Sequence, residues 1–213
     1  MKLFIDSADV QDIYSCMNSG LISGVTTNPT LIKKSGRNPD DVYRELIQMR
    51  VEDISMEVVG SADDMLKDAG RLIELFGEDV STIKLPCTPD GLKVCRVLSA
   101  DGIRCNVTLI FSAAQAILAA KSGATYASVF VGRCDDNSVA GLEVVRSVAE
   151  VYGRHGVKTQ VLSASIRDVY KVTRSFYNGA HIVTMPPSIF HKMYNHVLTD
   201  AGMAIFNSDA GLM

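Results

Sequence analysis

The strongest constraint on how this 213-residue chain folds is an alternation that repeats eight times along it. Each repeat begins with a short apolar or β-branched run, which predicts a buried strand, and continues with a longer stretch of helical periodicity. Strands that alternate with helices pair in parallel through right-handed crossovers, so the pattern predicts the α/β class. The predicted strands cover residues 2–6, 22–27, 54–59, 81–85, 103–109, 126–131, 159–164 and 181–185.

Eight strand–helix units close naturally into a single (β/α)8 TIM barrel, and this chain length suits one such domain over residues 1–213. An open doubly wound sheet is the competing arrangement. Its phosphate-binding turn, G-x-G-x-x-G after the first strand, is absent, because the first turn reads Asp6-Ser7-Ala8-Asp9. We therefore expect the barrel, with a C-terminal tail over about residues 199–213.

The composition argues against several classes of protein. A formal net charge of -3 disfavours non-specific binding to nucleic acid or to an anionic membrane, since both require a basic face. No run of about 18 apolar residues is present to span a membrane, and the first apolar run stops at Asp6, too early for a signal peptide. The five cysteines are scattered, which favours reduced thiols in a cytoplasm over a disulfide framework.

Polar side chains recur at one parity near the C-terminal ends of the predicted strands. Because successive residues of a strand face opposite sides, this parity places the polar set inside the barrel and the aliphatic set against the helices. Active sites of this fold lie at that end of the strands. The set comprises Asp6, Thr26, Thr27, Asn28, Glu57, Lys84, Asn106, Thr108, Ser128, Phe130, Ser163 and Ser165.

Each of these residues has a plainer explanation when taken alone. A single charge in a strand is often half of a structural ion pair, Ser and Thr are frequent strand formers, and Phe130 would ordinarily belong to the core. The combination favours function, because one lysine and two acids in a single lumen are costly to bury unless they are paired or used.

One lysine between two carboxylates suits carbonyl chemistry. Desolvation among Ile83, Leu85 and Pro86 should favour the neutral amine of Lys84, which attacks a ketone and forms an iminium that accepts electrons from a neighbouring carbon–carbon bond. Asp6 and Glu57 suit the proton transfers, and Thr108 can hold the water. A nearby carboxylate opposes the desolvation, so either desolvation wins or one acid is neutral; the sequence leaves both open.

Two arginines follow the sixth and seventh predicted strands at the same end of the barrel. Arg133 and Arg167 around Ser165 form a natural phosphate clamp, although either alone would ordinarily be a solvated surface residue. The histidines show no metal-ligand spacing, so we expect neither a metal nor another cofactor. The four are His155, His181, His191 and His196.

Five motifs, in order along nearly the whole chain, resemble those of the transaldolases, and more closely the short subfamily that includes the fructose-6-phosphate aldolases. They start at residues 26, 83, 106, 130 and 163 and read TTNPT, IKLP, NVTLIFS, FVGR and SASIR. The resemblance implies a barrel enzyme in which Lys84 forms a Schiff base with a ketose phosphate and passes a dihydroxyacetone unit to an aldose phosphate.

The resemblance also implies a role for each matched residue. Asp6 is the acid/base for bond cleavage, and Glu57 and Thr108 manage the catalytic water. The donor and its hydroxyl groups are held by Asn28, Thr27, Asn106 and Ser128, and Phe130 belongs to the same site. The phosphate is met by Arg133, Ser165 and Arg167.

Two positions bear on which activity of the family this is. The aldolases of the subfamily carry Gln where Glu57 stands and Tyr where Phe130 stands, whereas the transaldolases carry Glu and Phe. A tyrosine hydroxyl would help to release free dihydroxyacetone, and Phe130 supplies none, so transfer is favoured. The alternatives are a fructose-6-phosphate aldolase and, more remotely, a barrel that binds sugar phosphates without turnover.

The resemblance extends to assembly and location. Its short members form pentamer-based rings, often decamers, so we expect a cytoplasmic homo-oligomer in the non-oxidative pentose phosphate pathway. The tail over about residues 199–213 is the segment expected to reach a neighbouring copy.

Overall fold

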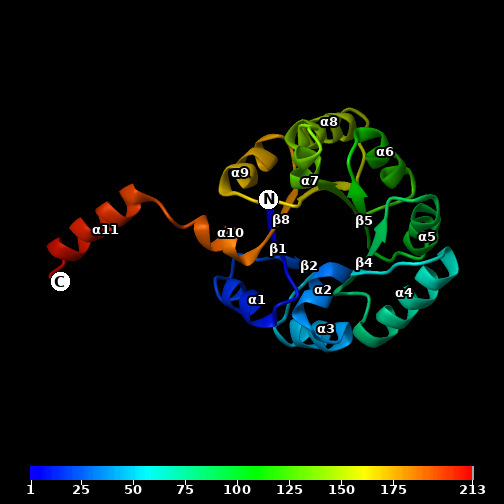
Figure 1. Cartoon of the computed structure of the whole chain (residues 1–213), viewed down its shortest axis with the longest axis horizontal. Coiled ribbons are helices and arrows are strands. Elements are labelled where there is room, and N and C mark those ends of the chain that lie inside the picture. Colours follow the sequence, from blue (N-terminus) through cyan, green and yellow to red (C-terminus); the bar gives the residue numbers. More distant parts are fainter. Residues whose placement is uncertain (213) are drawn as a thin grey trace.

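The computed structural model describes residues 1–212 and contains a closed barrel of eight parallel strands in sequence order, which confirms the predicted fold class (Figure 1). Helices surround the barrel on its outer side. The strands are β1 (Lys2–Asp6), β2 (Gly24–Thr26), β3 (Ile54–Glu57), β4 (Ser81–Pro86), β5 (Cys105–Ile110), β6 (Tyr126–Phe130), β7 (Gln160–Ala164) and β8 (Ile182–Met185).

Most of the helices begin directly after a residue whose side chain caps them. Ser61 and Asp64 form a reciprocal capping box at the start of α4, and Thr88 caps α5 ahead of Pro89. The helices are α1 (Val10–Met17), α2 (Pro29–Ser35), α3 (Pro39–Gln48), α4 (Ala62–Phe76), α5 (Pro89–Ala100), α6 (Ala113–Lys121), α7 (Val131–Asp136), α8 (Gly141–Arg154), α9 (Val169–Tyr177), α10 (Pro187–Lys192) and α11 (Val197–Asp209).

Strand register places charged and polar residues of the lumen beside one another in pairs. Asp6 pairs with Thr26 between β1 and β2, and Glu57 pairs with Lys84 between β3 and β4. Lys84 pairs in turn with Asn106 of β5. Residues paired across parallel strands point to the same side of the sheet, so these side chains become lateral neighbours. Aliphatic residues of the opposite parity, such as Ile83, are fully buried in the core cluster that includes the helices.

An apolar and hydrogen-bonded layer fills the lumen beneath these residues. Phe4 and Tyr126 meet edge to face with ring centroids 6.2 Å apart, in a cluster with Leu162 and Ile182. The Tyr126 hydroxyl donates to Asp53 Oδ2 at 2.6 Å. Packed side chains therefore fill this part of the lumen, and the cavity lies at the C-terminal ends of the strands.

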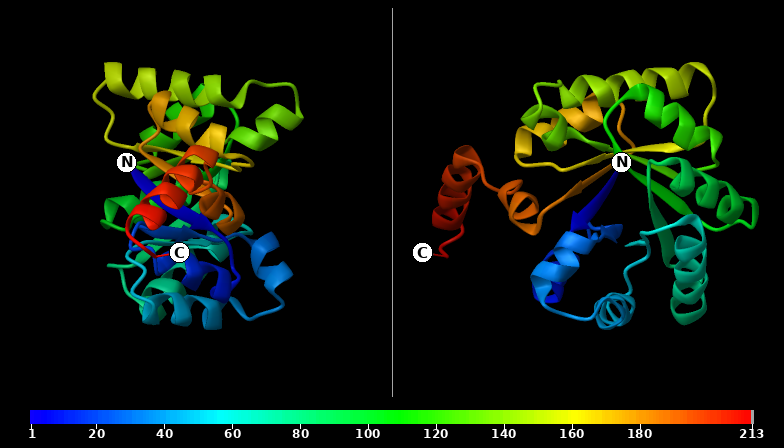
Figure 2. Two further views of the ribbon diagram at one scale, coloured as in Figure 1. Left: turned by 90° about the vertical axis from the view of Figure 1, so that its left-hand side faces the viewer. Right: turned by 45° about the vertical axis from the view of Figure 1, so that its right-hand side comes forward.

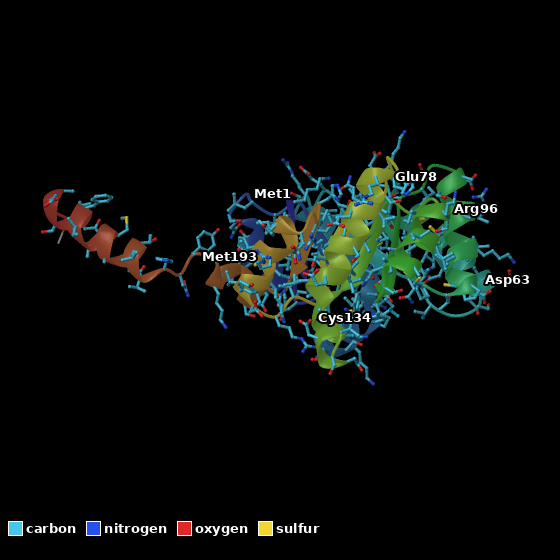
Figure 3. All side chains as sticks on the ribbon, turned by 90° about the horizontal axis from the view of Figure 1, so that it is seen from above. Met1, Asp63, Glu78, Arg96, Cys134 and Met193 are labelled. Atoms are coloured by element: carbon cyan, nitrogen blue, oxygen red, sulfur yellow. The ribbon has the colours of Figure 1, made fainter. Side chains whose placement is uncertain are left out.

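The C-terminal helix α11 stands apart from the barrel. It extends beyond Met193 and α10, on a segment that leaves the body of the molecule (Figures 2 and 3). None of its residues is buried, and Leu198 and Phe206 are 72% and 67% exposed. The predicted tail of about 199–213 thus falls largely in this helix, except that residue 213 lies outside the described residues. Among residues 1–212, no helix is both long enough and apolar enough to cross a membrane.

Candidate active site

A cavity opens at the C-terminal mouth of the barrel, where the sequence predicts the site. Seven residues that were given a role in the site line it, joined by Thr26, which belongs to the predicted polar set but had no assigned role, and by Ala164 and Thr184, which were not predicted. The seven predicted residues are Asp6, Asn28, Lys84, Ser128, Phe130, Arg133 and Ser165.

Lys84 lies at the centre of this cavity wall. Its side chain rises from β4 and is only 4% exposed, between the outward-facing Ile83 and Leu85. The amine donates to the backbone carbonyl of Thr27 at 2.7 Å and lies 2.9 Å from Glu57 Oε2. A buried ammonium needs such partners, because leaving it unpaired in this lumen would cost several kcal/mol. The amine is thus held in one place by two acceptors, one on β3 and one just past the end of β2.

Glu57 and Thr108 each have a buried oxygen without a hydrogen-bond partner among the described residues. The Glu57 carboxylate is 9% exposed, and its Oε2 lies at ion-pair distance from Lys84 without a hydrogen bond of good geometry. The buried Thr108 hydroxyl also has no hydrogen-bond partner among the described residues. Buried polar atoms in native proteins are nearly always satisfied, so unsatisfied ones point to a water or a ligand. Neither Glu57 nor Thr108 is among the residues that line the cavity. The water-managing role of this pair stays a prediction.

Asp6 enters the cavity from the end of β1. Burial raises the pKa of its carboxyl above the ordinary value, against the opposing effects of the positive charge of Lys84, the hydrogen bond from Thr26 and the positive charge of Arg133. Thr26 donates to Asp6 Oδ1 at 2.8 Å, and Thr184 Oγ1 lies 2.7 Å from Thr26 Oγ1. A carboxyl whose pKa is moved toward neutrality suits both acceptance and return of a proton.

Amides and a second hydroxyl lie near the amine. Asn28 caps α2 through Oδ1, which accepts from the Leu31 N–H at 2.9 Å, so the amide nitrogen of Asn28 remains for a ligand. Ser128 Oγ donates to Asn106 Oδ1 at 2.6 Å, and Asn106 Nδ2 donates to Ser55 Oγ at 3.1 Å. Ser55 thus supports the site from below, which the sequence analysis did not foresee.

Two polar residues of the predicted set point elsewhere. The Thr27 hydroxyl donates to the Ser55 carbonyl at 3.0 Å and lies 3.1 Å from the Tyr43 hydroxyl, so only its backbone carbonyl meets Lys84. Ser163 lies 2.8 Å from Ser175 of α9, on the outer side of the barrel. The inward-facing threonine at the end of β2 is Thr26.

The predicted phosphate clamp has one cation at the cavity and one beside it. Arg133 lines the cavity and lies over the Phe130 ring, 5.2 Å from its centroid. Ser165 has a φ of 58°, which turns the chain after β7 and brings its side chain to the cavity. The Arg167 guanidinium forms a bidentate ion pair with Asp136 of α7.

Gly132 packs α7 against the turn after β7. Its N–H donates to the Ser165 carbonyl at 3.0 Å. A Cβ at this position would lie 2.3 Å from that carbonyl oxygen and 2.8 Å from Arg167 Nε. The absence of a side chain therefore lets the three predicted phosphate-binding residues lie close together.

The described residues offer no obvious metal centre. Within residues 1–212, no three His, Cys, Asp or Glu side chains gather closely enough to hold a metal ion. The five cysteines are free thiols, and four of them are buried.

Comparison with known proteins gives a consistent picture. Residues 3–211 match the family described as Transaldolase/Fructose-6-phosphate aldolase. A probable transaldolase of Symbiobacterium thermophilum is 48% identical over 210 residues, which cover 98% of this chain and 96% of that protein. Probable transaldolases of Paracoccus denitrificans and Dinoroseobacter shibae are 46% and 44% identical at the same coverage of both chains. The resemblance inferred from the five motifs is thus confirmed along nearly the whole chain.

Proposed function

The chain belongs to the transaldolase/fructose-6-phosphate aldolase family, and from this premise we propose that it is a transaldolase acting through a Schiff base on Lys84. The donor is a ketose phosphate, sedoheptulose 7-phosphate or fructose 6-phosphate. The acceptor is an aldose phosphate, glyceraldehyde 3-phosphate or erythrose 4-phosphate. This reaction belongs to the non-oxidative pentose phosphate pathway, in the cytoplasm.

The observation that carries the proposal is the placement of the Lys84 amine. It is buried in the wall of a cavity, 2.9 Å from a carboxylate oxygen, and the same cavity is lined by a second acid, Asp6. A fixed amine with one acid for each set of proton transfers, Glu57 and Asp6, can serve both halves of the reaction without moving.

In the first half, Lys84 becomes the nucleophile. Its proton passes to Glu57, the nearest carboxylate, and the neutral amine attacks the ketone carbon of the donor. The carbinolamine oxygen then takes a proton and leaves as water, and the nitrogen lone pair forms the iminium. The unsatisfied Thr108 hydroxyl, two residues beyond the Asn106 that pairs with Lys84, holds that water and later returns it for hydrolysis.

In the second half, Asp6 governs the carbon–carbon bond. It accepts the proton of the hydroxyl group on the carbon beyond the bond that breaks. That oxygen becomes the carbonyl of the leaving aldehyde, while the bonding electrons move into the iminium and form an enamine. The acceptor aldehyde reacts by the reverse route, and Asp6 returns its proton to the new hydroxyl.

The outer part of the site suits the phosphate of either sugar. Arg133 lies at the cavity and Ser165 supplies a hydroxyl beside it, within a turn that also carries Arg167. Arginine matches phosphate oxygens with two parallel hydrogen bonds. The small hydroxylated end of the donor would be bound near Asn28, Asn106 and Ser128, where amide and hydroxyl groups face the lumen.

Phe130 favours transfer over release of free dihydroxyacetone. It lines the cavity, and its ring packs edge to face with Phe111 at a centroid distance of 5.9 Å. An apolar ring at this place supplies no proton for the bound enamine, so the three-carbon unit should wait for an acceptor. Glu57 also matches the transaldolases, which carry Glu at this position where the aldolases of the subfamily carry Gln.

A paired assay tests the proposal. With fructose 6-phosphate as donor, we expect rapid consumption only when erythrose 4-phosphate is present, and little free dihydroxyacetone without it. Equal rates with and without acceptor, accompanied by dihydroxyacetone release, would identify an aldolase. No turnover of either kind would leave a sugar-phosphate-binding barrel and contradict the proposal.

We further propose that the protein is a homo-oligomer, a pentamer or decamer, in which α11 packs on a neighbouring copy. An isolated helix of 13 residues is marginal in water, and this one has no contact that buries it. Its exposed apolar residues include Leu198, Ile205 and Phe206, which suits burial against another chain. Sedimentation of the full chain and of a chain ending at residue 195 distinguishes the cases, because a monomer in both would contradict the assembly.

A further inference from the structure

Thr184 was not foreseen as a site residue, yet it lines the cavity with Asp6 and Lys84. It lies on β8, next to β1 in the closed barrel, and is 2% exposed. Its hydroxyl oxygen lies 2.7 Å from that of Thr26, which in turn donates to Asp6 Oδ1 at 2.8 Å. The three residues thus form a continuous hydrogen-bonded chain, drawn from three adjacent strands, that ends on the carboxylate.

The number of protons fixes the direction of this chain. Each hydroxyl has one proton to donate. Thr26 gives its proton to Asp6, so in the contact between the two threonines Thr184 must be the donor and Thr26 the acceptor. Donation into the Thr26 oxygen polarises its O–H bond and strengthens the hydrogen bond to the carboxylate. Thr184 therefore acts on Asp6 indirectly, through Thr26.

We propose that Thr184 is a positioning residue for the carbon–carbon bond step: through Thr26 it holds Asp6 Oδ1 as an acceptor and leaves Oδ2 to exchange the proton with substrate. The inference rests on the proposed transaldolase reaction, in which Asp6 performs that exchange. A carboxylate free to rotate would offer either oxygen, whereas one anchored through Oδ1 presents the other in a fixed direction.

The charged surroundings of Asp6 make the chain consequential. Lys84 of β4 and Arg133 of α7 favour the ionised carboxylate, as does the Thr26 hydrogen bond, and burial opposes all three. Glu57 of β3 faces the amine of Lys84 from the other side. Burial outweighs the other three effects and raises the pKa of Asp6. Losing a hydrogen bond that opposes burial should therefore raise this pKa further.

The test is Thr184→Val, which keeps the shape and removes the hydroxyl. A hydrogen bond of this kind contributes about 0.5–1.5 kcal/mol, so the acidic limb of the kcat/KM profile should move up by roughly 0.4–1 pH unit. The transfer rate at neutral pH should fall by about 2- to 12-fold. Thr184→Ser, which restores the hydroxyl, should return both values to those of the parent.

A second readout separates positioning from structure. Borohydride trapping of the Lys84 adduct with fructose 6-phosphate reports formation of the Schiff base. Because that step does not need Asp6, the rate of adduct formation should be unchanged in Thr184→Val. Thr82→Val is the matched control. Thr82 also donates to a buried aspartate, Asp53, at 2.9 Å, but it does not line the cavity. This control should leave the pH profile unshifted.

Each outcome decides the matter. An unshifted acidic limb in Thr184→Val, a shift that Thr184→Ser fails to restore, or an equal loss of adduct formation would overturn the inference. If the parent enzyme itself forms no adduct and transfers nothing, the proposed function fails as well. If the parent enzyme is active and only the Thr184 results are negative, the proposed function is retained and the inference about Thr184 is wrong. Should the valine variant fold poorly, Thr184→Ala carries the same expectation for the pH profile.

Discussion

Gly132→Ala places a single methyl group between the two segments proposed to bind phosphate. The new Cβ would lie 2.3 Å from the Ser165 carbonyl oxygen, 2.8 Å from Arg167 Nε and 3.0 Å from Ser165 Oγ. The first contact is with backbone, which cannot rotate away. To reach even 3.0 Å, the turn after β7 must move by about 0.7 Å, which exceeds the tolerance of about 0.5 Å for a binding constellation.

The magnitude of the effect follows from these contacts. Overpacking of this kind costs about 1–3 kcal/mol, and for a chain of this size each kcal/mol lowers Tm by about 2–4 °C. Loss of one hydrogen bond to a charged group costs about 1.5–3 kcal/mol. The KM for a phosphorylated acceptor should therefore rise by roughly 10- to 150-fold.

The assay compares erythrose 4-phosphate with unphosphorylated glyceraldehyde as acceptor. We expect the loss with the phosphorylated acceptor only, since Lys84, Asp6 and Glu57 lie on other strands. Gly70→Ala is the control: this exposed position in α4 has open space for a Cβ, and the change should stabilise the helix by up to about 1 kcal/mol. An unchanged KM for erythrose 4-phosphate in Gly132→Ala, or an equal loss with both acceptors, would refute the reasoning.

Three further substitutions test other parts of the account. Burial raises the pKa of Asp6, so the folded state holds this proton more tightly than the unfolded chain, and the free energy of unfolding falls as pH rises from about 3.9 through the folded value. Asp6→Asn should therefore abolish transfer yet raise Tm more at pH 8 than at pH 4; a lower Tm at pH 8 would contradict this sign. Phe130→Tyr should increase release of free dihydroxyacetone relative to transfer, and an unchanged ratio in the paired assay would show that our account of this ring is wrong. Asp136→Asn should free the Arg167 guanidinium, which Asp136 now engages in an ion pair. The KM for phosphorylated acceptors should then fall several-fold, with no change for unphosphorylated ones. A higher KM would mean that Asp136 orients Arg167 for the phosphate.

The barrel and the core of the site were predictable because both follow from periodicity. Eight strand–helix repeats leave little choice of architecture. Because side chains alternate along a strand with a period of two, Glu57 and Lys84 point to the same side of neighbouring strands. Register then makes them partners, and the structure shows an ion pair at 2.9 Å. Thr184 carried the same signal, as a lone polar residue between Val183 and Met185, and could have been found in this way.

The residues that periodicity misplaced lie where the strand geometry ends or breaks. β2 stops at Thr26, so Thr26 faces the cavity and Thr27 meets Tyr43 behind it. In β7, parity should have placed Ser165 on the same side as Ser163, away from the lumen. The left-handed backbone of Ser165, with φ at 58°, reverses that direction. A serine carries no sequence signal for positive φ comparable to glycine, so only the structure separates the two residues.

The most direct measurement of the central claim is mass spectrometry of the enzyme after borohydride reduction in the presence of fructose 6-phosphate. The account predicts one added dihydroxyacetone-derived group per chain, mapped to the peptide that contains Lys84 and absent in Lys84→Ala. An adduct on a different lysine, or an active enzyme in which Lys84→Ala still transfers the three-carbon unit, would contradict it.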